Sequence, residues 1–186
     1  MSDTLAKVQP TPVPSVARMA ATSVGAAPEA PANATARGVP VAADGAPPEA
    51  LGLTREALSG AGFDGSINST LVIPGETGTV TVAVGIGSSA ALDANALRNA
   101  GAAFARAAGS HAHLAFDLAG TDTVPVGLAA QSIVEGALLA RYRYDSLRSA
   151  PAREGVESVT IVCTNDSTGE GELGARRGRM FGGVTQ

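Results

Sequence analysis

The 186-residue sequence has little of what several classes of protein need. Its single cysteine, Cys163, excludes an intrachain disulfide, and two tyrosines, four phenylalanines and no tryptophan leave few rings for stacking on nucleic-acid bases. Only 16% of the residues are charged, the net charge is −4 and the pI is about 5.1. The chain therefore lacks the excess of basic residues that is typical of a nucleic-acid-binding domain. No apolar run is long enough to cross a membrane and no signal-peptide pattern opens the chain, so we expect a cytoplasmic location.

Proline is concentrated at the start of the chain, where eight of the 11 prolines precede residue 49. Apolar periodicity is weak there, and proline removes backbone donors. We therefore predict a disordered, Ala/Pro-rich tail over residues 1–35. The run Gly38–Ala42 is compatible with a first strand, and Pro40 within it favours an edge position in the sheet.

From residue 51 onward, helical and strand periodicities alternate. The predicted helices span residues 51–61, 93–108, 126–142 and 170–184, and the predicted strands span residues 70–73, 79–84, 113–118 and 159–163. The last of these strands is apolar throughout, which is typical of a fully buried strand. This alternation predicts a layered α/β domain with a mostly parallel or mixed sheet and helices on both faces.

The last predicted helix has an apolar side that runs to the end of the chain. It carries Leu173, Arg177, Met180, Phe181 and Val184 at helical spacing. No capping glycine, polar tail or proline follows Val184, so we expect the chain to stop before its natural boundary.

The sharpest local motif is the turn Gly85-Ile86-Gly87-Ser88-Ser89-Ala90, which lies between a predicted strand and a predicted helix. A dinucleotide-binding turn has this form, because its glycines let a phosphate approach the backbone and a helix N-terminus. However, the helix begins only near Asp93, and no ribose-binding acid follows at the expected distance. We therefore favour a structural turn, in which glycine is needed for the backbone conformation, over a dinucleotide-binding site.

Two other groups of side chains have both a functional and a structural interpretation. His111 and His113, with Asp117 on the same strand face, have the residue types of a metal site, but their number favours surface histidines. Cys163 has the chemistry of a nucleophile, but no base accompanies it in the sequence, so a buried and inert thiol is favoured.

The remaining candidates concern binding. Tyr142 and Tyr144 fit either a subunit contact or a cover for the sheet edge, and both interpretations stay open. Arg176, Arg177 and Arg179 are the nearest thing to a basic patch; a solvated helix face is favoured over DNA binding.

Residues 79–163 carry a family resemblance in three pieces. The pieces are Val82–Gly87 followed by Leu92–Ala103, then Leu114–Leu118, and, as the most specific, Val134–Asp145. The last is similar to the E-G-x-x-L-x-x-Y-R-F-D run of the leucyl (cytosol) aminopeptidases, and Ala61–Gly65 also fits. The chain resembles the N-terminal domain of that family over about residues 36–186.

The resemblance implies a fold and a partner. In the family, an N-terminal α/β domain of macro-domain-like shape precedes a catalytic domain that holds two divalent metal ions (zinc or manganese) and removes N-terminal residues from peptides. We therefore expect a three-layer, macro-domain-like mixed sheet over residues 36–186, following the tail. The expected partners are a catalytic domain or other subunits of an aminopeptidase oligomer, with no nucleic acid and no membrane.

The family's catalytic signatures, V-G-K-G-x-x-F-D-S-G-G and N-T-D-A-E-G-R, do not occur in this sequence. Its only lysine is Lys7, and Asn165–Thr168 is not followed by Glu-Gly-Arg in the required place. We therefore predict no catalytic, cofactor-binding or metal-binding residue in this chain, no peptidase activity of the chain alone, and a structural or assembly role. The alternative is a macro-like module that binds a nucleotide or ADP-ribose.

Overall fold

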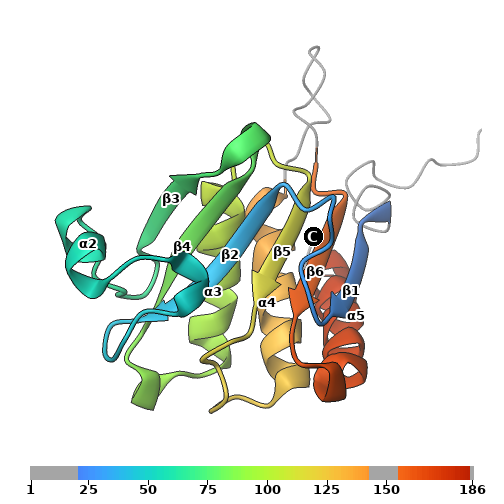
Figure 1. Ribbon diagram of the computed structural model, residues 1–186. Coiled ribbons are helices and arrows are strands. Elements are labelled where there is room, and N and C mark those ends of the chain that lie inside the picture. Colours follow the sequence, from blue (N-terminus) through green and yellow to red (C-terminus); the bar gives the residue numbers. More distant parts are fainter. Residues whose placement is uncertain (1–20, 143–154, 185–186) are drawn as a thin grey trace, which may run out of the picture.

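The computed structural model describes residues 21–142 and 155–184, which form a six-stranded sheet with helices packed on it (Figure 1). In chain order the strands are β1 (Ser23–Ala27), β2 (Ala36–Ala42), β3 (Thr70–Pro74), β4 (Val80–Gly87), β5 (His113–Asp117) and β6 (Ser158–Val162). Their spatial order is β1-β6-β5-β2-β4-β3. All neighbours are parallel except β3, which pairs antiparallel with β4, so the predicted mixed sheet is confirmed.

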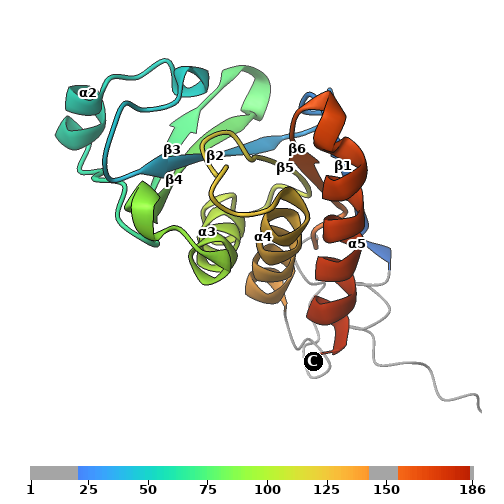
Figure 2. The same cartoon turned by 90° about the horizontal axis from the view of Figure 1, so that it is seen from below.

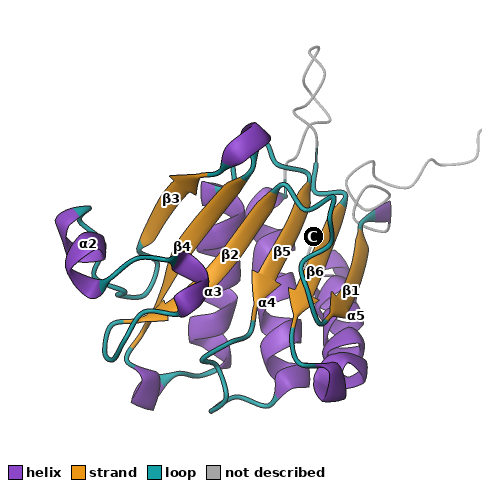
Figure 3. Cartoon of the chain, viewed as in Figure 1, coloured by secondary structure: helices purple, strands orange, loops and turns teal. Residues whose placement is uncertain are grey.

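Three long helices lie side by side on one face of the sheet (Figure 2). They are α3 (Ala94–Ala107), α4 (Val126–Arg141) and α5 (Thr168–Val184), and α4 packs between the other two. A short helix, α2 (Arg55–Gly60), lies on the opposite face near β3 and β4 (Figure 3). Helices therefore cover both faces, but very unequally. In the described part of the chain, no helix is both long and apolar enough to span a membrane.

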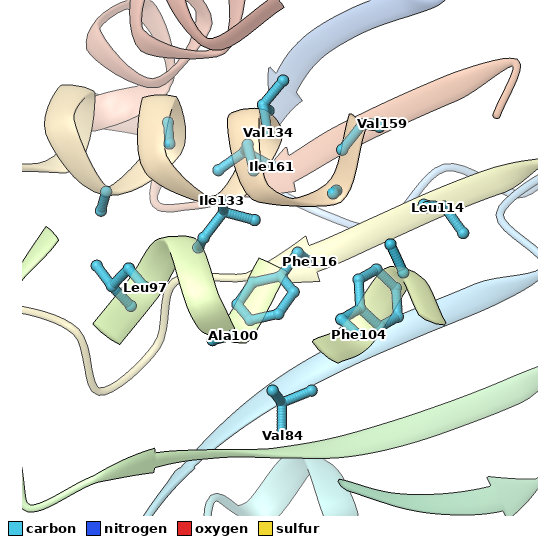
Figure 4. Close-up of a cluster of buried hydrophobic side chains, with 14 of the residues drawn as sticks. Val84, Leu97, Ala100, Phe104, Leu114, Phe116, Ile133, Val134, Val159 and Ile161 are labelled. Carbon is cyan, nitrogen blue, oxygen red and sulfur yellow. The ribbon is translucent and has the colours of Figure 1, made fainter. Parts of the chain in front are cut away.

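The main core lies between the sheet and the three long helices (Figure 4). Strands contribute alternate residues to it, such as Val84, Phe116 and Ile161, because successive side chains of a strand point to opposite faces. The helices contribute residues at 3.6-residue spacing, such as Leu97 and Ile133. The rings of Phe104 and Phe116 meet edge to face at a centroid distance of 5.4 Å, a favourable aromatic geometry.

A second, smaller core lies on the opposite face of the sheet. Val41 and Ala83 point to that side and are buried under Leu58 of α2 and Phe63 of the loop that follows it. This core holds the segment between β2 and β3 against the sheet. It leaves that face otherwise without a long helix among the described residues.

The helix layer is held together by backbone contacts at glycine. A Cβ atom on Gly101 of α3 would lie closer than 3.0 Å to the backbone of Ile133 in α4, a separation that real Cβ atoms essentially never have. Gly174 of α5 approaches the backbone of Gly127 in α4 in the same way, and Gly178 approaches the carbonyl of Gln131. Glycine is required at these positions because any side chain would push the helices apart.

Two predictions for the N-terminal part of the fold are wrong. Residues 23–27, assigned to the tail, form β1, which pairs in register with all of β6. β2 is a central strand, although Pro40 favoured an edge. It pairs with β4 along its whole length but with β5 only over Ala36–Gly38, so Pro40 lies beyond the last residue paired on that side. Residues 1–20 of the predicted tail lie outside the described residues.

One prediction for the C-terminal part also needs correction, and α5 has an unexpected orientation. β6 is not buried throughout, because only Val159 and Ile161 are fully covered and their neighbours are partly exposed. The predicted apolar side of α5 points away from the core: Leu173 is 58% and Met180 67% exposed. The buried side of α5 is made of small residues instead, and the side chain of Val184 lies outside the described part.

The other elements agree closely with the predictions. Asp93 caps α3 by accepting a 2.8 Å hydrogen bond from the Ala96 N–H, and Gly109 follows the end of that helix with φ of +60°. β4 is longer than predicted and includes Gly85 and Gly87, and α2 begins at Arg55 behind its cap Thr54, later than expected.

Two substitutions in α5 test the glycine contacts. Gly174→Ala should lower the free energy of unfolding by about 1–3 kcal/mol, because the new methyl group has no space against Gly127. Gly169→Ala, on the same helix with open space around it, should be neutral or stabilising by up to about 1 kcal/mol. Urea denaturation of both variants measures the difference. Equal effects would contradict the close packing.

Candidate functional site

The motif that carries the family resemblance is Val134–Asp145, of which Val134–Arg141 forms the second half of α4 and residues 143–145 lie outside the described residues. Its acid, Glu135, accepts a 3.2 Å charged hydrogen bond from Nη2 of Arg98 on α3, and only 16% of the Glu135 side chain is exposed. Nη1 of Arg98 also donates to Oδ1 of Asn95 at 2.7 Å. This charged pair links two helices and faces no assembled catalytic group among the described residues.

Two further residues of the motif also bind α3. A Cβ atom on Gly136 would collide with the carbonyl oxygen of Arg98, so glycine is needed where the two helices cross. Nη1 of Arg141 donates to the carbonyl oxygen of Ala105 at 3.1 Å, near the end of α3. Glu135, Gly136 and Arg141 therefore fasten α4 to α3 along their length, which assigns this part of the motif a packing role.

The space beside the glycines at the end of β4 is filled by the protein itself. A Cβ atom on Gly85 would collide with Ser66 and Ser69 of the loop before β3, and one on Gly87 would lie 2.9 Å from the Ile67 side chain. Gly87 also has φ of +76°, a left-handed conformation that favours glycine. The absence of side chains at these glycines thus lets a loop of this chain pack against the backbone of β4. In a dinucleotide-binding turn, a phosphate would occupy that position.

Asp44 fills the polar end of the same turn. Its carboxylate accepts hydrogen bonds from the Ser89 N–H at 3.0 Å and from Oγ of Ser88 at 2.9 Å. The backbone hydrogen bond from Ser89, followed by the hydroxyl of Ser88, holds the pKa of Asp44 below its usual value. A negative charge already sits on the donors that a phosphate would use, so the geometry gives the nucleotide alternative no support.

The candidate metal residues are spread along β5. Nδ1 of His113 lies 3.0 Å from Oγ of Ser158 on β6, and its Nε2 lies 3.6 Å from a carboxylate oxygen of Glu157, which precedes that strand. His111 precedes the strand, and Asp117 is four residues beyond His113, roughly 13 Å along a strand. Within residues 21–142 and 155–184, no three His, Cys, Asp or Glu side chains are grouped as a metal would need.

Asp117 has a different partner, which the sequence did not reveal. Its carboxylate is buried at the end of β5, and Oδ2 accepts from Nε and Nη2 of Arg37 on β2, at 3.1 and 2.7 Å. Parallel pairing of β2 with β5 places these residues together, although 80 positions separate them in the sequence. The ion pair ties two central strands and leaves Oδ1 without a protein partner.

Cys163 follows β6 and lies under the start of α5. It is half-buried, not fully buried as predicted, and a Cβ atom on Gly171 of α5 would lie 3.2 Å from its sulfur. The thiol thus packs at the contact between β6 and α5. Packing is the role that its surroundings support.

The remaining candidates are the two tyrosines and the arginines of α5, and they lie in different parts of the fold. Tyr142 ends α4 and packs partly against the main core, whereas Tyr144 lies outside the described residues. Arg176 pairs with Glu172 at 2.6 Å on the exposed side of α5. Arg179 donates to the carbonyl oxygen of Thr22 at 3.1 Å, so one of the three arginines binds the N-terminal side of the fold.

Together these contacts define a class of protein. The domain is a small, layered α/β unit in which the side chains of Asp44, Asp117, Glu135 and Arg179 all contact other parts of the same chain. No nucleophile, base and acid converge there, and the candidate metal ligands do not meet.

The family follows from comparison with known proteins. A sequence model of the N-terminal domain of the cytosol aminopeptidase family matches residues 40–151, more than half of the chain. The chain therefore belongs to the cytosol aminopeptidase family, in its N-terminal domain. A search of curated proteins found no match.

Solved structures share this fold. The bottromycin maturation enzyme BotP in complex with Mn has 27% sequence identity to this chain and a TM-score of 0.58. A second BotP structure, described without Mn, has 28% identity and a TM-score of 0.57. Each match covers 80% of this chain. A K354E mutant of tomato leucine aminopeptidase has 20% identity, a TM-score of 0.63 and 81% coverage. The chain spans only 29% of the BotP chains and 34% of the tomato chain.

Two alanine substitutions compare how much a partly buried ion pair, Arg98–Glu135, and an exposed one, Glu172–Arg176, contribute to stability. Glu135→Ala should cost about 2 kcal/mol of unfolding free energy, because it leaves Arg98 without its charged acceptor. Glu172→Ala removes a shorter but exposed pair on α5 and should cost less than about 1 kcal/mol. Chemical denaturation measures both. A larger loss from Glu172→Ala would contradict the role assigned to the α4 motif.

Asp44 generates a pH-dependent prediction. Because its pKa is lower in the folded state, its stabilisation is complete above about pH 4 and is lost as the pH falls through the lowered pKa. The difference in melting temperature between the wild type and Asp44→Ala should therefore be largest near neutral pH and shrink at about pH 3. Asp44→Asn, which keeps one acceptor oxygen, should lose less at neutral pH. A difference that does not change with pH would refute this assignment.

Proposed function

We propose that this chain acts as the non-catalytic N-terminal domain of a leucyl aminopeptidase-like metallo-exopeptidase, an enzyme class that removes N-terminal residues from peptides. The match of residues 40–151 to the N-terminal domain of the family carries the proposal. The BotP and tomato leucine aminopeptidase structures that resemble it are about three times as long as the part they share with this chain. On this proposal, the chemistry belongs to that additional part.

The side chains of this domain support a structural role. The family motif on α4 binds α3 through Glu135, Gly136 and Arg141, and the charged pair Arg37–Asp117 binds β2 to β5. These residues stiffen the domain, and a stiff domain is suited to holding a catalytic domain or neighbouring subunits in place. The expected partners are a catalytic domain or other subunits of an aminopeptidase oligomer.

A two-metal centre does not fit the described residues. Such a centre needs several carboxylates converging on ions about 3.5–4 Å apart, and no group of three potential ligands is present in the described part. BotP is described with bound Mn, so metal chemistry is a property of at least one relative. We place any divalent ions of the proposed enzyme in its catalytic domain.

The proposal predicts that the purified chain does not hydrolyse a chromogenic leucine amide, with or without added Mn²⁺ or Zn²⁺. The physical reason is that no described side chains are arranged to bind a metal-activated water. Tomato leucine aminopeptidase in the same buffer is the positive control. Leucine release at rates comparable to that enzyme, retained through a second purification step, would overturn the proposal.

The expected catalytic partner can be tested by sequencing the DNA downstream of the codon for Gln186. The proposal predicts that this DNA encodes an N-T-D-A-E-G-R segment and a lysine-bearing V-G-K-G-x-x-F-D-S-G-G segment, or that a neighbouring gene does. A genome in which neither segment accompanies this domain would argue against a catalytic partner.

A further inference from the structure

We draw no further inference here: the strongest candidate, the exposed apolar surface patch on the outer side of α5 that includes Leu173 and Met180, carries none because nothing in the structure shows what covers it.

Discussion

The contact of α4 with its two neighbouring helices, made backbone to backbone at glycine, is the constraint on which the rest of the fold depends. Gly101 and Gly136 bring α3 against α4, and Gly174 and Gly178 bring α5 against it. Because the helices approach so closely, there is no room between them for large side chains, and the core needs few rings. The glycines at these helix contacts and the small number of aromatic residues in the helix layer therefore follow from one packing arrangement.

The same constraint explains where the polar residues of the family motif are used. Once α3 and α4 are in backbone contact, Arg98 and Glu135 pair across them, and Arg141 reaches the last turn of α3. Beyond the ends of β2 and β4, the carboxylate of Asp44 accepts hydrogen bonds from Ser88 and Ser89. The domain thus uses these polar groups in contacts within itself. This use of its polar residues supports the proposed scaffold role beside a separate catalytic domain.

Much of this fold is predictable from periodicity, and the errors have a common cause. Strands β3 to β5 and helices α3 and α4 follow their apolar patterns, and Asp93 marks the start of α3. β1 was missed because its residues are small and lie among prolines. The apolar spacing of α5 does not mark its buried side, because glycine packs there instead. The pairs Arg98–Glu135 and Arg37–Asp117 join residues 37 and 80 positions apart, which no local pattern reveals. The family resemblance identified the right motif, but only the structure assigned its residues to packing.

Native-state hydrogen exchange tests the central claim most directly, because it measures the stability of each helix within one molecule. If glycine contacts fix α4 between α3 and α5, its amides should exchange only by global unfolding, with an opening free energy equal to that from urea denaturation. The amides of α2, which lies on the sparsely covered face, should exchange by local opening at a lower free energy. Exchange of the α4 amides at a lower free energy than those of the central strands would show that the helix layer opens by itself, and would contradict this account.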